Sequence, residues 1–270
     1  MKVHTKPPIG WGDDLLTHFQ ATAILNEYST FAHQVDWQRL LQDIASDLHK
    51  CSRYAIDNIT KVDDASALLL FATAHNQFLG AVRLAASGQC LATYPVSRAA
   101  VESALYGWYV SCGADIAKRW HNKPLHGDKE GQKNWNKEFK FSSLCQQLAR
   151  ISPNEAKWAR HLHQSAIDMG GHPNRDALYS NMRSVQRDNE APIIQMQFLH
   201  QWGMAAAAAM NAAVETGMFI LRLFPMAFPE SEPNLGVSAN AVVFVRRLQK
   251  LKQAAKNEFD YLGGDGSSSG

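Results

Sequence analysis

Apolar residues recur every three or four positions along almost the whole chain, the spacing of one face of an α-helix. The longest such stripe covers about six turns and consists of Trp37, Leu41, Ile44, Leu48, Cys51, Ala55 and Ile59. Sustained apolar–polar alternation rich in β-branched residues is absent, and so is the Asn-Gly hairpin dipeptide. The pattern therefore predicts an all-α fold, a single compact bundle of about seven to nine helices without significant sheet.

Turn and capping residues divide this pattern into elements. Helices are expected at residues 15–31, 37–59, 68–85, 96–112, 142–149, 153–168, 195–224 and 238–261. Ser152, Pro153 and Glu155 have the spacing of a capping box with a first-turn proline. Pro95 is expected in the first turn of its helix, and glycines at 88, 113 and 170–171 are expected to end three others. The inward face of the last helix is expected to carry Val242, Val245, Leu248, Leu251 and Ala255.

The chain shows no repeat of fixed period and no linker long enough to divide it. Residues 1–262 are therefore expected to form one helical domain, and the apolar-poor tail 263–270 (GGDGSSSG) is expected to be disordered. Residues 118–140 contain Pro124, Gly127 and Gly131 among many lysines. We expect this part to be an irregular, partly exposed excursion between helices.

Composition indicates a cytoplasmic protein. Hydrophobic residues make up 46% of the chain, enough for a sizeable core, and the net charge is only +2. The four cysteines have neither zinc nor disulfide spacing, so reduced thiols are expected. The N-terminus lacks a signal-peptide core. The most membrane-like stretch, 203–224, contains Asn211, Glu215 and Arg222, which favours a buried central helix over a membrane span.

Arg98 and Glu102 form the first candidate site. They lie four residues apart in an otherwise apolar helix, so both side chains share one face and can pair or converge on a common target. Charges in such surroundings need partners, and we expect both to be largely buried. They form either an internal ion pair that fixes helix packing or a polar site inside the bundle.

The run Ser165–Asn174 (SAIDMGGHPN) is the second candidate. Asp168 opposes the dipole at a helix C-terminus, and two glycines allow the chain to turn His172 back towards it. A carboxylate that orients an imidazole is typical of general bases and of metal-bound histidines. The alternative is an ordinary helix stop in which Asp168 or Asn174 caps backbone groups. We expect this pair to meet Arg98 and Glu102, and we expect no bound metal or cofactor, since His161 and His163 point to different helix faces.

The excursion at 118–140 is the third candidate, because it interleaves cations with aromatic rings. Lys123 and Trp135 represent this pattern, which suits phosphate attraction combined with base stacking. Acidic residues dilute the charge, so the alternative is a solvated segment whose tryptophans pack back onto the core. A second basic cluster, Arg246, Arg247, Lys250, Lys252 and Lys256, is interpreted as the solvated face of the last helix.

Two short stretches, Tyr94–Val110 with its R-x-x-x-E and Ser165–Asn174 with its I-D-x-G-x-H-P-N, resemble segments of uncharacterised all-helical bacterial proteins. These are distantly similar to the HEPN superfamily of nucleotide-binding and ribonuclease domains, many of which act in phage defence or toxin systems. The superfamily pattern is an arginine and a histidine on one helix with four to six residues between them, and Arg119 and His126 match it with six residues between. The resemblance implies that these two would activate and orient a ribose 2′-hydroxyl. Pro124 and Trp120 depart from the pattern.

Common enzyme signatures, namely the dinucleotide and P-loop glycine motifs, G-x-S-x-G and H-E-x-x-H, are absent. The leading hypothesis is a helical binding or regulatory protein, linked through the resemblance to prokaryotic defence or stress systems. The alternative is a metal-independent HEPN-like ribonuclease with an interior polar site. The expected partner is a nucleic acid or another protein, a second copy of the chain included.

Overall fold

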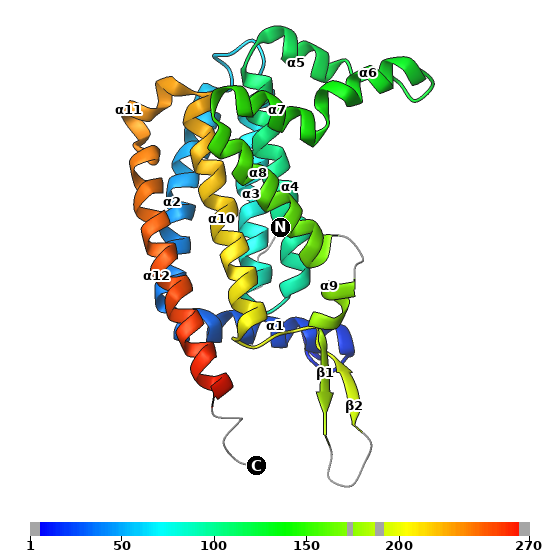
Figure 1. The fold of residues 1–270 in the computed structure, drawn as a ribbon, viewed down its shortest axis with the longest axis vertical. Helices are drawn as coiled ribbons and strands as arrows, with labels where there is room; N and C mark the ends of the chain where they lie inside the picture. The colour runs from blue at the N-terminus through cyan, green and yellow to red at the C-terminus, as the bar shows by residue number, and fades with distance from the viewer. Residues whose placement is uncertain (1–5, 172–174, 187–191, 265–270) are drawn as a thin grey trace.

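Helices account for nearly all of the regular structure in the computed structural model, which describes residues 6–171, 175–186 and 192–264 (Figure 1). The first eight are α1 (Leu15–His33), α2 (Val35–Asn58), α3 (Ser66–Ala86), α4 (Cys90–Ser111), α5 (Ala114–His121), α6 (Lys129–Phe139), α7 (Phe141–Ile151) and α8 (Pro153–Ala166). A π-turn η1 (Ile167–Gly171), α9 (Arg175–Ser180), α10 (Met204–Ala227), a short 3-10 turn η2 (Pro229–Ser231), α11 (Glu232–Leu235) and α12 (Val237–Gly264) follow. The all-α class is confirmed, with more helices than the seven to nine expected.

The sheet in the described residues is one antiparallel ribbon of β1 (Met182–Val185) and β2 (Ile193–Met196), with Met182 opposite Met196. It extends from the end of the bundle that α1 crosses (Figure 1). The expected helix over 195–224 therefore begins later, at Met204, because its first residues belong to β2 and to an irregular connection. The two four-residue strands, MRSV and IIQM, lack the strict apolar–polar alternation by which a sequence indicates a half-buried strand.

Helix α10 lies at the centre of the bundle, against α2, α3, α4, α8 and α12 (Figure 1). It buries side chains around most of its circumference, among them Met210, Val214, Phe219 and Phe224. Within the described residues, it is also the one helix whose length and composition would allow it to cross a membrane. Most of the apolar part of this helix is buried against neighbouring helices, as predicted for a central core helix.

Pro95 lies inside α4 and not in its first turn, because α4 begins five residues earlier, at Cys90. A proline within a helix cannot donate to the carbonyl four residues before it, here Leu91. Gly170 of η1 packs at that carbonyl: a Cβ on it would lie 2.9 Å from the Leu91 oxygen, and its φ of +150° favours glycine. The interrupted turn of α4 is thus where the Gly170-Gly171 segment makes its close approach.

Residues 118–140 are mainly helical, so the prediction of an irregular excursion is wrong for most of this range. The Asp128 side chain caps α6 by accepting a hydrogen bond of 2.8 Å from the Gly131 backbone N–H. Pro124 lies in the short connection between α5 and α6, where it interrupts neither helix. The alternative for the tryptophans is confirmed: Trp120 and Trp135 are half-buried and pack against the core.

Three predictions from α8 onward, on a helix cap, a helix face and the start of the tail, are wrong in whole or in part. Helix α8 begins at Pro153 as expected, but Ser152 makes no side-chain cap, and Glu155 instead pairs with Arg222 of α10. In α12, the predicted inward face is correct only in part: Leu248 and Ala255 are buried, but Val242 and Val245 are exposed. Val237, Ala241 and Phe244 are buried instead. The expected tail also differs, since α12 extends to Gly264 and residues 265–270 lie outside the described part.

Candidate functional site

Arg98 and Glu102 pair along α4, with the Arg98 Nε donating to Glu102 Oε1 at 2.8 Å. The Nε2 of His163, from α8, lies 2.9 Å from the same oxygen, and its ring stacks on Phe141 at 3.8 Å. We call Arg98, Glu102 and His163 the ion-pair cluster. It is less buried than expected, because the side chains of Arg98 and Glu102 each keep 32% of their exposure. The prediction that Arg98 and Glu102 share one helix face is confirmed. The third member, His163, follows Glu102 by 61 residues along the chain.

The ion-pair cluster lowers the pKa of Glu102. Partial burial acts in the opposite direction, but the hydrogen bonds from His163 and Arg98 outweigh it and hold the carboxyl below its ordinary pKa. A carboxyl whose pKa is lower in the folded state stabilises the fold above its unfolded pKa, and this contribution is lost as the pH falls through the folded value. The cluster therefore joins α4 to α8 most firmly at neutral pH.

Replacement of Glu102 by alanine is expected to lower the free energy of unfolding by about 1–2 kcal/mol. A hydrogen bond to a charged group contributes about 1.5–3 kcal/mol, and the solvent that still reaches this pair reduces the figure. Urea unfolding at pH 7 and at pH 3.5 would measure it, with a smaller difference between wild type and variant expected at the lower pH. Equal losses at both pH values would contradict the role assigned to the ionised carboxylate.

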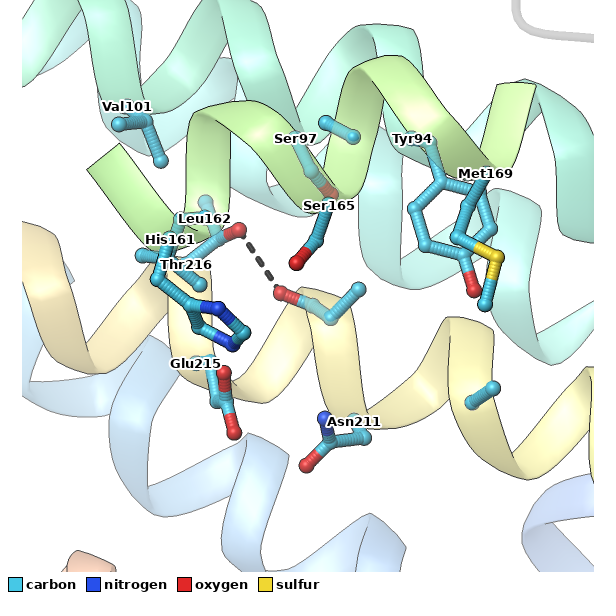
Figure 2. Close-up of a pocket in the computed structure, with 13 residues that line it drawn as sticks. Tyr94, Ser97, Val101, His161, Leu162, Ser165, Met169, Asn211, Glu215 and Thr216 are labelled. Carbon is cyan, nitrogen blue, oxygen red and sulfur yellow. Dashed lines mark hydrogen bonds between the residues drawn. The ribbon is translucent and has the colours of Figure 1, made fainter. Parts of the chain in front are cut away.

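A cavity of about 160 Å³ lies beside this cluster, between α4, α8 and α10. Its walls are mainly apolar: Val101, Leu162, Ala166, Met169, Ala208 and Ala212. Figure 2 shows His161, Glu215 and Thr216 at one end of it and Tyr94 and Met169 at the other, with Ser165 and Asn211 between them. We call this space the α4–α8–α10 cavity, and no side chain of the ion-pair cluster lines it.

Two polar atoms at this cavity are buried and have no hydrogen-bond partner among the described residues: Ser97 Oγ and Asn211 Oδ1. Two other polar residues of the lining do have partners: the Thr216 hydroxyl donates to the Ala212 carbonyl at 2.8 Å, and Glu215 accepts from Lys252 at 2.8 Å. Burial raises the pKa of the Tyr94 phenol to about 12, with a smaller effect from Cys90, so it is neutral at physiological pH. Buried polar atoms without a partner are uncommon in folded proteins, and each needs a physical explanation.

The second predicted constellation is only partly covered by the structure. His172 and Asn174 lie outside the described residues, so the predicted meeting of His172 with Arg98 and Glu102 remains a prediction. Asp168 lies in η1 after α8 and accepts a hydrogen bond of 2.7 Å from Gln164 Nε2. The histidine that contacts Glu102 is His163. As expected, His161 lies on a different face of α8, where it lines the cavity.

Some residues of the third constellation contact one another. The Arg119 guanidinium donates to both carboxylate oxygens of Glu138, at 2.7 Å and 3.0 Å. Lys123 Nζ lies 4.8 Å from the centre of the Trp135 ring, and Phe139 stacks on that ring at 4.8 Å. Arg119 lies in α5, whereas His126 lies in the connection after it, so the two do not share a helix.

Weak signals in the sequence point to the site residues that were not predicted. Asn211 is one of few polar residues within the mainly apolar central helix, and Ser97 precedes Arg98 in another apolar helix. The spacing along each helix shows that these atoms are candidates for burial, but not that they face one cavity. His163 lies next to the inward Leu162 of α8, and its pairing with Glu102 depends on how the two helices pack.

Among the described residues, no three His, Cys, Asp or Glu side chains lie close enough together to hold a metal ion. The four cysteines are free thiols: Cys51, Cys90 and Cys145 are buried, and Cys112 is exposed. Comparison with family models, with curated proteins and with solved structures finds no match to this chain. The function is therefore inferred from the geometry of the site.

Proposed function

We propose that this chain is a helical binding protein that holds a small, uncharged polar molecule in the α4–α8–α10 cavity. The observation that carries the proposal is that two residues lining one cavity, Ser97 and Asn211, each have a buried oxygen atom, Oγ and Oδ1, without a partner among the described residues. A ligand that donates to the Asn211 oxygen and exchanges a hydrogen bond with the Ser97 hydroxyl would satisfy both. Ligand sites commonly combine apolar walls with a few convergent polar groups of this kind.

The volume and charge of the cavity limit the ligand. A cavity of about 150 Å³ accommodates benzene, so 160 Å³ suits a molecule of roughly six to ten non-hydrogen atoms. The carboxylate at its edge, Glu215, is already paired with Lys252. An ionic ligand would lose its hydration without gaining a counter-charge, which favours a neutral amide, cyclic urea or nucleobase-like ring.

A thermal-shift screen with neutral amides, cyclic ureas and free nucleobases tests this proposal. A ligand at a hundred times its Kd stabilises the folded state by about 2.7 kcal/mol, which raises the midpoint measurably. Ser97→Ala and Asn211→Leu should each abolish that rise, and Ser111→Ala, the same change on α4 outside the cavity, should keep it. Because an unpartnered buried hydroxyl costs about 1–3 kcal/mol, Ser97→Ala without ligand should be as stable as wild type or more so.

Two results of the screen would overturn the proposal. One is that no compound stabilises the wild type. The other is that active compounds stabilise both cavity variants to the same degree, which would mean that they bind elsewhere and that the cavity contains only water. The unchanged stability expected for Ser97→Ala separates loss of binding from loss of folding.

We also propose that this binding protein acts in a prokaryotic defence or stress system. The support is the resemblance of two short stretches, Tyr94–Val110 and Ser165–Asn174. The ribonuclease alternative receives less support from the described geometry. Its arginine, Arg119, is held by both oxygens of Glu138, and His126 lies beyond the end of the same helix. An arginine with its guanidinium committed in this way is not available to polarise a phosphate or a hydroxyl.

A further inference from the structure

Helices α5 and α6 project together from the end of the bundle opposite α1 (Figure 1). We call residues 114–140 the arm. It contains seven lysines and arginines and four acids, a surplus of three positive charges. The whole chain has a surplus of only two, so the rest of the molecule is slightly acidic. The net positive charge of the protein is therefore concentrated on the arm.

The acids of the arm do little to neutralise its lysines. Glu138 is bound by the Arg119 guanidinium and by the Tyr109 hydroxyl, and chiefly the hydrogen bond from Arg119 lowers its pKa. Asp128 caps α6. Asp115 and Glu130 lie in the first turns of α5 and α6, where a negative charge interacts favourably with the helix dipole. The acids of the arm thus cap its helices, interact with their dipoles or pair with Arg119, and among the described residues none forms an ion pair with a lysine of the arm.

The lysines, in contrast, face solvent. All six are exposed, and the described residues include no ion pair to any of them: Lys118, Lys123, Lys129, Lys133, Lys137 and Lys140. Lys129, Lys133 and Lys137 are spaced by four residues, which places them on one face of α6 about 6 Å apart. One strand of a nucleic-acid duplex presents a phosphate about every 3.4 Å along its axis, so this row can contact several in succession.

The aromatic residues indicate which form of nucleic acid suits the arm. Proteins that bind single strands stack bases on exposed rings. Here one face of Trp135 is covered by Lys123 and another aromatic ring, Phe139, stacks on it, while Trp120 packs against the core. We propose that the arm binds the phosphate backbone of a double-stranded nucleic acid, through its lysines and without reading sequence. This surface is separate from the α4–α8–α10 cavity and does not depend on it.

An anionic membrane surface is the competing partner for a lysine-rich arm. A segment that inserts at a bilayer surface combines cations with an exposed apolar face. Within the arm, the one large hydrophobic side chain that is exposed is Leu125, at 84%. Three of the lysines, Lys129, Lys133 and Lys137, follow the length of α6, which favours an extended polyanion.

Fluorescence anisotropy with a labelled duplex of arbitrary sequence, measured from 50 to 200 mM salt, tests the proposal. The arm variant carries Lys129→Gln, Lys133→Gln and Lys137→Gln. The matched control removes three exposed cations from α12, through Arg246→Gln, Lys250→Gln and Lys256→Gln, so both variants have the same net charge. We expect the arm variant to bind about tenfold or more weakly at 50 mM salt. Its slope of log affinity against log salt should be shallower by about 3, since each phosphate contact contributes about 0.9.

The control variant should retain most of the affinity and the slope of the wild type. Absence of duplex binding by the wild type at 50 mM salt would overturn the proposal, and so would equal losses in the two variants. Tighter binding to a single strand than to the duplex would overturn the proposal and indicate recognition by base stacking. Tighter binding to vesicles containing anionic lipid would assign the arm to membranes instead. Circular dichroism of the arm variant, expected to match the wild type, confirms that the fold is retained.

Discussion

Replacement of Arg222 by alanine is expected to lower the free energy of unfolding by about 3 kcal/mol or more. Arg222, in α10, donates from Nε and Nη2 to Oε1 of Glu155 at 2.9 Å and 2.7 Å. Glu155, at the start of α8, keeps only 5% of its exposure, and its second oxygen has no partner among the described residues. Removing the guanidinium would leave a buried carboxylate without a counter-charge, which costs more than the pair itself contributes.

Urea denaturation of two further variants shows whether burial is the cause. Arg247→Ala breaks the pair with Asp43, which is more exposed, and should cost less than about 1 kcal/mol. The double variant Glu155→Met, Arg222→Met removes both charges and should recover most of the stability lost in Arg222→Ala. A loss below about 1 kcal/mol in Arg222→Ala would show that solvent or another donor satisfies Glu155.

The fold class was predictable because most helices carry their own pattern. Helix α2 buries Trp37, Leu41, Ile44 and Leu48, as their spacing indicated. The last helix was harder, since valines occur on more than one of its faces and spacing alone allows more than one inward stripe. The stripe that is buried begins at Val237 and includes Phe244, because this is the face that packs against α2 and α10. The choice between such faces is made by neighbouring helices that a single pattern does not contain.

The features that the sequence did not predict depend on single side chains or on contacts between residues far apart in the sequence. Helix α6 begins at a cap formed by Asp128 in a run rich in glycine and lysine, where the apolar pattern is weak. The capping box predicted at Ser152 failed because Glu155 forms a stronger, charged pair with Arg222 of α10. A local rule was overridden in this case by a tertiary contact 67 residues away.

The candidate site was predictable to the same extent. The Arg98–Glu102 pair follows from a spacing of four on one helix, and the structure has it. Its third member, His163, and the common cavity of Ser97 and Asn211 require α4, α8 and α10 to be placed together. Polar residues in apolar helices indicated where partners were needed, and only the packing of the helices shows which groups supply them.

Helix packing also produces the second large effect that we expect, at Gly217 of α10. A Cβ at this position would lie 2.5 Å from Phe78 Cε2 and 2.6 Å from Ile44 Cγ2, both in fully buried side chains. Alanine is favoured over glycine by about 1 kcal/mol inside a helix, but overpacking of a filled core costs about 1–3 kcal/mol. We expect the steric term to exceed the propensity term, so that Gly217→Ala destabilises the fold by about 2 kcal/mol.

Gly80→Ala is the matched control, because it makes the same substitution inside helix α3. A Cβ there would meet only Val96 Cγ1, at an ordinary 3.6 Å, so the change should stabilise the fold by up to about 1 kcal/mol. Urea unfolding of both variants should give effects of opposite sign. Phe78→Leu, combined with Gly217→Ala, should cost less than the two single changes together, since the smaller side chain makes room for the methyl group. If Gly217→Ala proved as stabilising as Gly80→Ala, α10 could not lie as close to α2 and α3 as the structure places it.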